Sequence, residues 1–254
     1  MRKIFVIGIG VGDPRHMTVE AIEALNQVDV FFIPDKGAEK GALRDLRTTI
    51  CERFIADADY RTIDVDIPQR ATAGDYLCAV DQWHSRLADI YGRLFERELS
   101  QSEVGALLVW GDPAIYDSTL RIIERVRAKG IALEIEVIPG ISSVQVLAAK
   151  HRIALNQIGE SVLLTTGRKL ANGFPAEFGS VVVLLDGAQA FARLAEPDLD
   201  IFWGAYLGTE NEILISGKLA DIKDEIEVVR ARARRQHGWI MDTYLLRRSG
   251  SADN

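Results

Sequence analysis

Three glycine-bearing segments carry the residues best suited to chemistry, and each follows an apolar run. The segments are Gly8–Pro14 (GIGVGDP), Trp110–Ser118 (WGDPAIYDS) and Val137–Ser143 (VIPGISS). Glycine allows positive φ and close approach to the backbone, which suits a turn at the carboxyl end of a strand. The segments therefore predict a polar ligand site built from turns, with simple tight turns and helix caps as the plainer alternative.

The second and third segments indicate what kind of ligand such a site could hold. Gly111 and Asp112 offer backbone amides and a carboxylate at a sheet edge. A neutral adenosine with a zwitterionic tail suits that mixture, whereas Asp112 would repel a phosphate. Ser142 and Ser143 begin an expected helix, where hydroxyl groups and free amides can hold a polar ligand. The third segment lacks the GxSxG pattern of a nucleophilic serine.

The first segment could also belong to a nicotinamide-dependent oxidoreductase. Its glycines follow GxGxG rather than GxGxxG, and Asp13-Pro14 comes next. The following expected strand ends in Pro34-Asp35 rather than in a clear ribose-binding acid. This pattern therefore gives little support to a nicotinamide site.

Apolar runs and amphipathic segments alternate along the chain, which predicts an α/β fold with a mostly parallel sheet. The expected strands are Lys3–Ile9, Val28–Ile33, Arg61–Ile67, Val104–Trp110, Ile135–Ile138, Ser161–Thr166, Ser180–Leu185, Ile201–Leu207 and Trp239–Leu246. The expected helices are Val19–Asn26, Asp75–Leu99, Ser118–Lys129, Ser142–Lys150 and Ala220–Gln236. A change of character near the middle predicts two α/β domains, 1–117 and 118–248, and a disordered polar tail, 249–254.

Composition narrows the classes of protein. The 254 residues carry a net charge of −7, which argues against a nucleic-acid partner because phosphate binding needs a basic surface. No run reaches the ~20 apolar residues of a membrane span. The two cysteines have no metal-ligand spacing and are too few for a disulfide framework. We expect a cytoplasmic protein with no membrane partner and no metal.

Taken in order, the three segments resemble the tetrapyrrole methylases, the S-adenosylmethionine enzymes of cobalamin and sirohaem synthesis. That family carries VGxGxGDP, GDPxxYS and PGxSS elements, and GIGVGDP, WGDPAIYDS and IPGISS resemble them in this order. The resemblance implies two α/β domains with the active site in the cleft between them, commonly in a homodimer. It implies S-adenosylmethionine as methyl donor and a tetrapyrrole as substrate.

Further segments are similar to the deacetylating branch of the family. Examples are Gly41–Arg53, Val80–Arg86, Thr165–Arg168 and Gly238–Arg248. The resemblance implies methylation of precorrin-5 at C1 with loss of the acetyl group as acetate, giving precorrin-6A and S-adenosylhomocysteine. The alternatives are another precorrin or uroporphyrinogen methylase, a diphthine-forming methylase, and a non-catalytic tetrapyrrole carrier.

The resemblance also assigns roles to residues of this chain. The expected cofactor-binding residues are Gly111, Asp112, Ile115, Tyr116, Ser142, Ser143, Leu185, Asp186, Gly208 and Thr209. Glu212 and Lys218 replace the usual glutamine and second threonine of the late element, which weakens its expected adenine contacts.

Deacetylation needs a base or an activated water, and the substrate's carboxylates need cations. Candidate catalytic residues are Asp112, Tyr116 and Asp13, with His16 as a further candidate base. Pro14, Arg15, His16 and Arg168 are the expected substrate-binding residues. Arg44, Arg47, Arg70 and Lys169 are further candidate cations.

Overall fold

The computed structural model describes residues 1–35, 41–57, 59–71 and 74–249, and the chain forms two compact units, Met1–Ser142 and Ser143–Asn254. The structure thus moves the expected boundary from residue 117 to residue 142. The physical reason is β5 (Leu133–Ile138), which pairs in parallel with β1 (Arg2–Gly8) at the edge of the first sheet. The residues that follow Asp117 therefore complete the first unit.

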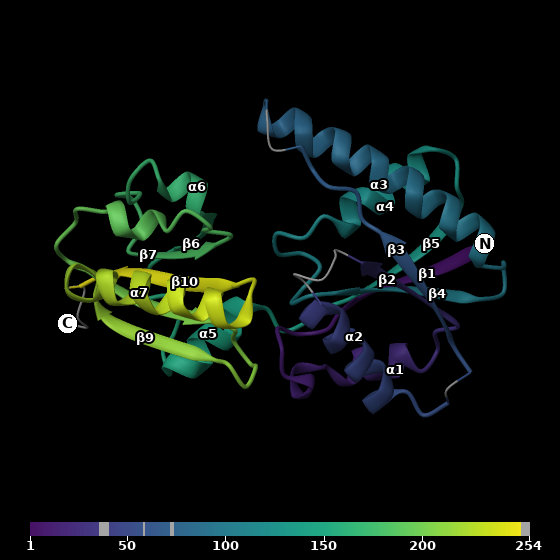
Figure 1. Cartoon of the computed structure of the whole chain (residues 1–254), viewed down its shortest axis with the longest axis horizontal. Helices are drawn as coiled ribbons and strands as arrows, with labels where there is room; N and C mark the ends of the chain where they lie inside the picture. The colour runs from purple at the N-terminus through teal and green to yellow at the C-terminus, as the bar shows by residue number, and fades with distance from the viewer. Residues whose placement is uncertain (36–40, 58, 72–73, 250–254) are drawn as a thin grey trace. The chain divides into compact units, whose positions relative to one another are not determined.

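The first unit is a five-stranded parallel sheet in the order β3-β2-β4-β1-β5 with helices on both faces (Figure 1). Its remaining strands are β2 (Val30–Asp35), β3 (Arg61–Asp66) and β4 (Val104–Val109). Its helices are η1 (Pro14–His16), α1 (Val19–Leu25), α2 (Gly41–Phe54), α3 (Tyr76–Glu98) and α4 (Thr119–Ala128).

Strand side chains alternate between two apolar cores, one on each face of this sheet. Ile4 and Val6 pack with buried residues of α3 and α4, while Phe5 and Ile7 pack with those of α1 and α2. A strand buried on both faces reads as a continuous apolar run, and Ile4–Ile7 is such a run. Helix α2, which lies outside the expected helices, contributes Ile50 to the second core.

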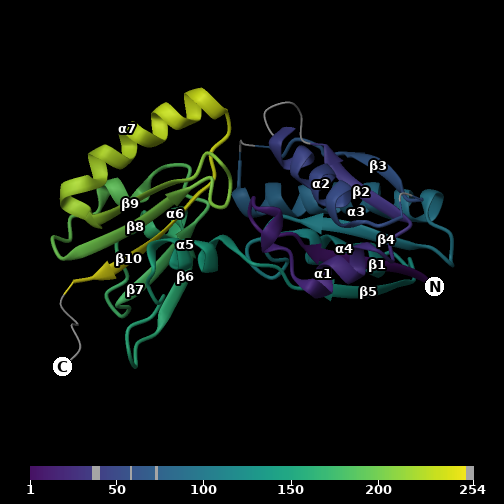
Figure 2. The ribbon, with the colours of Figure 1, turned by 90° about the horizontal axis from the view of Figure 1, so that it is seen from below.

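The second unit contains a mixed five-stranded sheet in the order β6-β7-β10-β8-β9 (Figures 1 and 2). Its strands are β6 (Val162–Thr166), β7 (Ser180–Leu184), β8 (Leu199–Ala205), β9 (Ile213–Lys218) and β10 (Asp242–Arg248). Its helices are α5 (Ser143–His151), α6 (Gly167–Leu170), η3 (Ala190–Arg193) and α7 (Leu219–His237). Only the β6–β7 pair is parallel, and β9 was not among the expected strands.

Helices cover both faces of the second sheet as well. Leu219 and Ile226 of α7 pack with Trp203 and Tyr244 in one core. On the opposite face Leu147 of α5 lies against Gly204. Figure 2 shows α7 and α5 on the two sides of the sheet.

The end of the chain departs in part from the expected tail. Ser249 donates its backbone N–H to Asp198 and its hydroxyl group to Asp200 Oδ2 at 2.8 Å, so this residue is tied to the second unit. The other residues of the expected tail, 250–254, lie outside the described residues. Within the described part of the chain, no helix is long and apolar enough to span a membrane.

Candidate functional site

The three glycine-bearing loops meet at the carboxyl ends of three neighbouring strands of the first sheet, β4, β1 and β5. A Cβ on Gly8 would lie 2.5 Å from Gly140 N, and a Cβ on Gly140 would lie 2.2 Å from Gly111 O. Neither spacing leaves room for a side chain, so only glycine allows these backbones to touch. Loops that are far apart in the sequence are thereby brought into one site.

Backbone hydrogen bonds and the Asp112 carboxylate hold the loops in contact. Gly111 N–H donates to Gly10 O at 2.8 Å. Asp112 Oδ2 accepts the Gly140 N–H at 2.9 Å, and Asp112 Oδ1 accepts the Ala114 N–H at 2.8 Å. Both carboxylate oxygens of Asp112, an expected cofactor and catalytic residue, are therefore engaged in fixing the two loops.

Asp13 and Arg15, expected at the catalytic and substrate sites, form an ion pair with each other. Arg15 Nη2 lies 2.6 Å from Asp13 Oδ2, and Arg15 N–H donates to Asp13 Oδ1. The guanidinium hydrogen bond lowers the pKa of Asp13 to about 2. A carboxylate with so low a pKa is a weak general base at neutral pH, so the geometry favours a positioning role for Asp13. Pro14 and His16 complete the same short turn, η1.

Tyr116 has a backbone conformation that L residues rarely adopt. Its φ is +50°, and its side chain is 44% exposed. Desolvation raises the pKa of its phenol, which stays protonated at neutral pH. Such strain costs on the order of 1–3 kcal/mol and persists where the surrounding structure enforces it, often at ligand sites. Half-buried Ile115 precedes Tyr116 in the loop.

A second group of expected cofactor residues gathers at one edge of the second sheet. β7 and β8 end at the edge where the antiparallel β10 begins. Leu185 follows β7 with φ +55° and 63% exposure, and Tyr206 follows β8 with φ +50°. Ser143 and Thr243 share a hydroxyl hydrogen bond of 3.0 Å at this edge. Sequence reasoning missed Tyr206, because a positive φ in a non-glycine residue leaves no mark in the sequence. It missed Thr243, because the contact of Thr243 with Ser143 joins residues 100 positions apart.

Asp186 points into the interior of the second unit, unlike its neighbour Leu185. It is 3% exposed, and its Oδ2 accepts the Tyr244 hydroxyl at 2.6 Å and the Ala190 N–H at 2.7 Å. Burial and the nearby carboxylate raise the pKa of Tyr244. Through these two hydrogen bonds, Asp186 holds the loop that contains Leu185 against the interior of the unit.

The late element Gly208-Thr209 forms a compact turn after β8. Gly208 has φ +77° and donates its N–H to Glu212 Oε2 at 2.8 Å, and Glu212 also pairs with Lys150. Thr209 Oγ1 donates to Tyr206 O at 2.8 Å. The side chain of Glu212, which departs from the family pattern, therefore stabilises this turn.

Other expected site residues lie elsewhere in their units. Ser142 is buried beside Gly111 in the first unit, so the PGISS element runs from one unit into the other. Arg168 is exposed in α6, directly after β6. Lys218 pairs with Asp200 at 3.1 Å. Among the described residues, no cluster of three or more His, Cys, Asp or Glu side chains is arranged to hold a metal ion.

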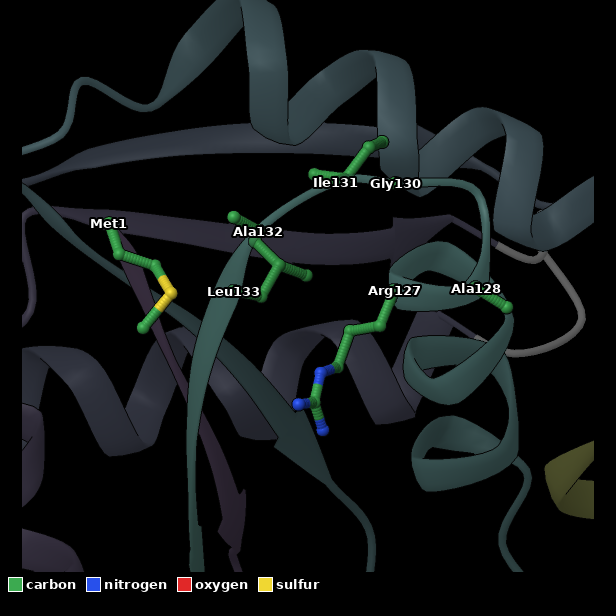
Figure 3. Close-up of a pocket in the computed structure, with 7 residues that line it drawn as sticks. All are labelled: Met1, Arg127, Ala128, Gly130, Ile131, Ala132 and Leu133. Atoms are coloured by element: carbon green, nitrogen blue, oxygen red, sulfur yellow. The ribbon is translucent and has the colours of Figure 1, made fainter.

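A surface pocket of about 490 Å³ lies at the opposite end of the first sheet (Figure 3). It is lined by Met1, Arg127, Ala128, Gly130, Ile131, Ala132 and Leu133. Met1 and Leu133 mark the amino ends of β1 and β5, whereas the glycine loops follow their carboxyl ends. The pocket is therefore separate from the candidate site.

The fold and the loop geometry define an α/β protein whose three glycine-bearing loops meet at one end of a parallel sheet, and comparison with known proteins identifies its class. Residues 3–223 match the family model described as Tetrapyrrole (Corrin/Porphyrin) Methylases. The chain belongs to this family. The two-sheet α/β fold agrees with that membership, as the sequence resemblance predicted.

Individual relatives extend the likeness over the whole chain. Precorrin-6A synthase [deacetylating] from Sinorhizobium sp is 53% identical over 255 residues, covering 100% of this chain and 98% of the relative. A cobalamin synthesis related protein (CobF) from Corynebacterium diphtheriae has a TM-score of 0.85 at 37% identity, covering 98% of this chain and 100% of that chain.

A more distant structure shares the fold. Uroporphyrin-III C-methyl transferase from Thermus thermophilus, solved with S-adenosyl homocysteine, has a TM-score of 0.58 at 18% identity and covers 96% of each chain.

Proposed function

We propose that this protein transfers a methyl group from S-adenosylmethionine to C1 of precorrin-5 and releases the acetyl group as acetate, which yields precorrin-6A and S-adenosylhomocysteine. The observation that carries the proposal is the 53% identity to precorrin-6A synthase [deacetylating] over the full chain. The contact of the three glycine loops adds local support, because the family elements are intact and touch one another.

The residues of the loops fit the methyl donor. The donor combines a neutral adenosine with a zwitterionic tail and a sulfonium. Gly111, Ile115 and Tyr116 offer backbone groups, an apolar side chain and an aromatic ring at the carboxyl edge of the first sheet, where open α/β sheets bind ligands, and Ser142 is buried beside Gly111. The direct backbone contact of Gly8 with Gly140 fixes the relative positions of these loops.

In the second unit Ser143, Leu185, Gly208 and Thr209 are the proposed cofactor contacts. Leu185 is the best placed for an apolar contact, because its side chain is 63% exposed at the sheet edge. Asp186 acts on the same loop from inside, through Ala190 and Tyr244. When bound, S-adenosylmethionine supplies an already activated methyl group, so orienting the acceptor carbon is the main task left to the protein.

The substrate needs cations, because it carries many carboxylates. Arg15 is 79% exposed at its side chain while paired with Asp13, so it can offer its remaining N–H groups to a substrate carboxylate. Arg44 is already paired with Asp64 at 2.9 Å, which makes it less available. Pro14, His16 and Arg168 remain proposed substrate contacts on the strength of the family resemblance.

The test is a reaction with defined components. Purified protein is incubated with precorrin-5 and S-adenosylmethionine carrying a ¹³C-methyl group, and products are followed by NMR and mass spectrometry. Label at C1 with one acetate per methylated ring is the expected result. Methylation at another carbon, or of another precorrin only, would keep the family and refute the specific reaction.

Location and assembly rest on the resemblance, which implies a cytoplasmic homodimer. Light scattering coupled to size-exclusion chromatography tests the assembly, and the expected mass is twice the 28.1 kDa of one chain.

A further inference from the structure

One histidine–serine pair in the first unit lies outside every role given so far. His84, on α3, is 6% exposed, and its Nε2 lies 2.9 Å from Ser118 Oγ. Ser118 is half-buried and stands at the N-cap position of α4, at the end of the loop that carries Asp112 and Tyr116. The pair therefore joins a buried imidazole to a hydroxyl in a loop of the proposed site.

The Ser118 hydroxyl does not make the hydrogen bond that is usual at the N-cap position of a helix. An N-cap serine ordinarily accepts a backbone N–H of the first helical turn. Ser118 makes no such bond, and the neighbouring Asp117 accepts the Thr119 N–H with its Oδ1 at 2.7 Å. Because Asp117 takes over this part of the cap, the Ser118 hydroxyl is left to the imidazole.

Burial, helped by nearby arginines, favours the neutral imidazole of His84. Burial has the largest effect and lowers the pKa of His84 below 6.5, and Arg125, Arg121 and Arg70 lower it further. Asp81 opposes them, but it is itself bound to Arg125. At neutral pH the imidazole can therefore accept the Ser118 proton through an unprotonated Nε2.

We propose that Ser118 is the acetyl acceptor of this enzyme and that His84 is its general base. This inference rests on the proposed function, which leaves the group that removes the acetyl unassigned. A partly buried serine hydroxyl hydrogen-bonded to a neutral histidine is the arrangement of an activated nucleophile. Its place, two residues after Tyr116, puts it in a loop that the same function assigns to the active site.

The chemistry balances with water as the one added reactant. Ser118 Oγ attacks the acetyl carbonyl carbon, and its proton passes to His84 Nε2. The bond between the acetyl carbon and ring C1 then breaks, leaving its electron pair on C1, where the product carries the new methyl group. His84 releases the proton it received to solvent; water then attacks the acetyl-Ser118 ester, giving one proton to His84 Nε2, which passes it to Ser118 Oγ. Acetate leaves and the second water proton goes to solvent, so two protons are released in each turnover. N–H groups of the first turn of α4 can stabilise the carbonyl oxygen.

The first experiment detects the ester without the natural substrate. Wild-type protein and the Ser118→Ala and His84→Gln variants are treated with 4-nitrophenyl acetate, and the peptide containing residue 118 is analysed by mass spectrometry. We expect one acetyl group on Ser118 in the wild type, none at this position in Ser118→Ala, and acetylation slowed about 100-fold or more in His84→Gln. Acetylation elsewhere with Ser118 unmodified would overturn the proposal.

A matched control separates chemistry from helix packing. Ser85 accepts a hydrogen bond from Arg125 Nη1 at 2.8 Å and so also links α3 to α4. Ser85→Ala removes a comparable contact and should leave the acetylation rate within about twofold of wild type. If Ser85→Ala slowed acetylation as much as His84→Gln does, the pair would be a packing contact and the proposal would fail.

The natural reaction tells failure of the inference from failure of the proposed function. Wild-type protein should release acetate from precorrin-5, and Ser118→Ala should lose at least about 100-fold in that rate while still binding S-adenosylhomocysteine by calorimetry. The wild-type rate should fall as pH drops through the pKa of His84, below 6.5. Acetate release by Ser118→Ala at the wild-type rate would sink the inference alone. A wild type that releases none would refute the proposed function.

Discussion

At Gly8 and Gly140 two backbones touch where any side chain would stand between them. The loops after β1, β4 and β5 could not reach the same positions with alanine at either residue, since a Cβ on Gly140 would fall 2.2 Å from Gly111 O. The clashing atom, Gly111 O, belongs to the backbone, which cannot move away as the end of a flexible side chain can. The geometry of the proposed cofactor site therefore depends on these single residues.

We expect Gly140→Ala to lower the free energy of unfolding by about 1–3 kcal/mol, as overpacking does elsewhere, and to weaken S-adenosylhomocysteine binding at least about tenfold. Thermal unfolding and calorimetry measure the two effects. Gly187→Ala is the control, because a Cβ there meets nothing within 4 Å and its φ is not positive. Equal unfolding free energies for the two variants would contradict the close contact.

Leu185 allows backbone strain to be separated from side-chain contact. At φ +55° a leucine or an alanine is strained but a glycine is not. Leu185→Gly should therefore be about 1 kcal/mol more stable than Leu185→Ala in chemical denaturation, although glycine ordinarily destabilises. Both variants should bind S-adenosylhomocysteine more weakly, because both lose the exposed side chain. An alanine variant more stable than the glycine variant would show that the loop is unstrained.

At the scale of elements, Arg47 of helix α2 donates a side-chain hydrogen bond to the backbone carbonyl group of Leu108 on β4. Pairing of β2 with β4 runs through Val30↔Gly105 and Phe31↔Ala106. If that register were extended to Pro34, this residue would stand opposite Val109, where proline has no N–H to donate to Leu108 O. Arg47 Nε of α2 donates to Leu108 O instead, at 3.0 Å, and burial lowers the pKa of Arg47.

A double-mutant cycle tests this exchange of donors. Arg47→Met should leave Leu108 O without a partner, which costs about 1–3 kcal/mol, although removing a buried charge offsets part of the loss. Pro34→Val restores an N–H on β2. We expect Arg47→Met to cost at least about 0.5 kcal/mol less in the Pro34→Val background, measured by urea unfolding. Strictly additive effects would mean that Arg47 does not stand in for the missing N–H.

At the scale of the molecule, each unit carries its own sheet and its own core. The first unit needs α4 and β5 for that core, because Val126 and Ile138 are fully buried. The division at Ser142 also separates the two groups of proposed cofactor residues, so neither unit holds all of them.

Fragments of the chain test the boundary. We expect residues 1–142 to unfold cooperatively with dispersed amide resonances, whereas residues 1–117 lack the edge strand β5 and should remain unfolded or aggregate. Circular dichroism during heating and two-dimensional NMR distinguish the outcomes. A cooperatively folded fragment 1–117 would show that the boundary expected from the sequence was sufficient.

The sequence by itself was enough for the fold class, the family and the positions of the three glycine-bearing loops after their strands. Continuous apolar runs and glycine-bearing turns are local patterns, so they can be recognised in the sequence without any knowledge of tertiary contacts. Helix α2 and strand β9 were not among the predicted elements, although the side chains of β9 alternate in burial as those of a strand do.

Tertiary structure alone decided which distant residues meet. The backbones of Gly8 and Gly140 touch, and Arg47 donates a hydrogen bond to Leu108 O. His84 and Ser118, which are 34 positions apart in the sequence, share a hydrogen bond. The position of the unit boundary and the strain at Tyr116, Leu185 and Tyr206 belong here too. The physical reason is the same throughout. Each feature depends on contacts between residues that are distant in the sequence, and the sequence of one element alone carries no sign of its contact with another.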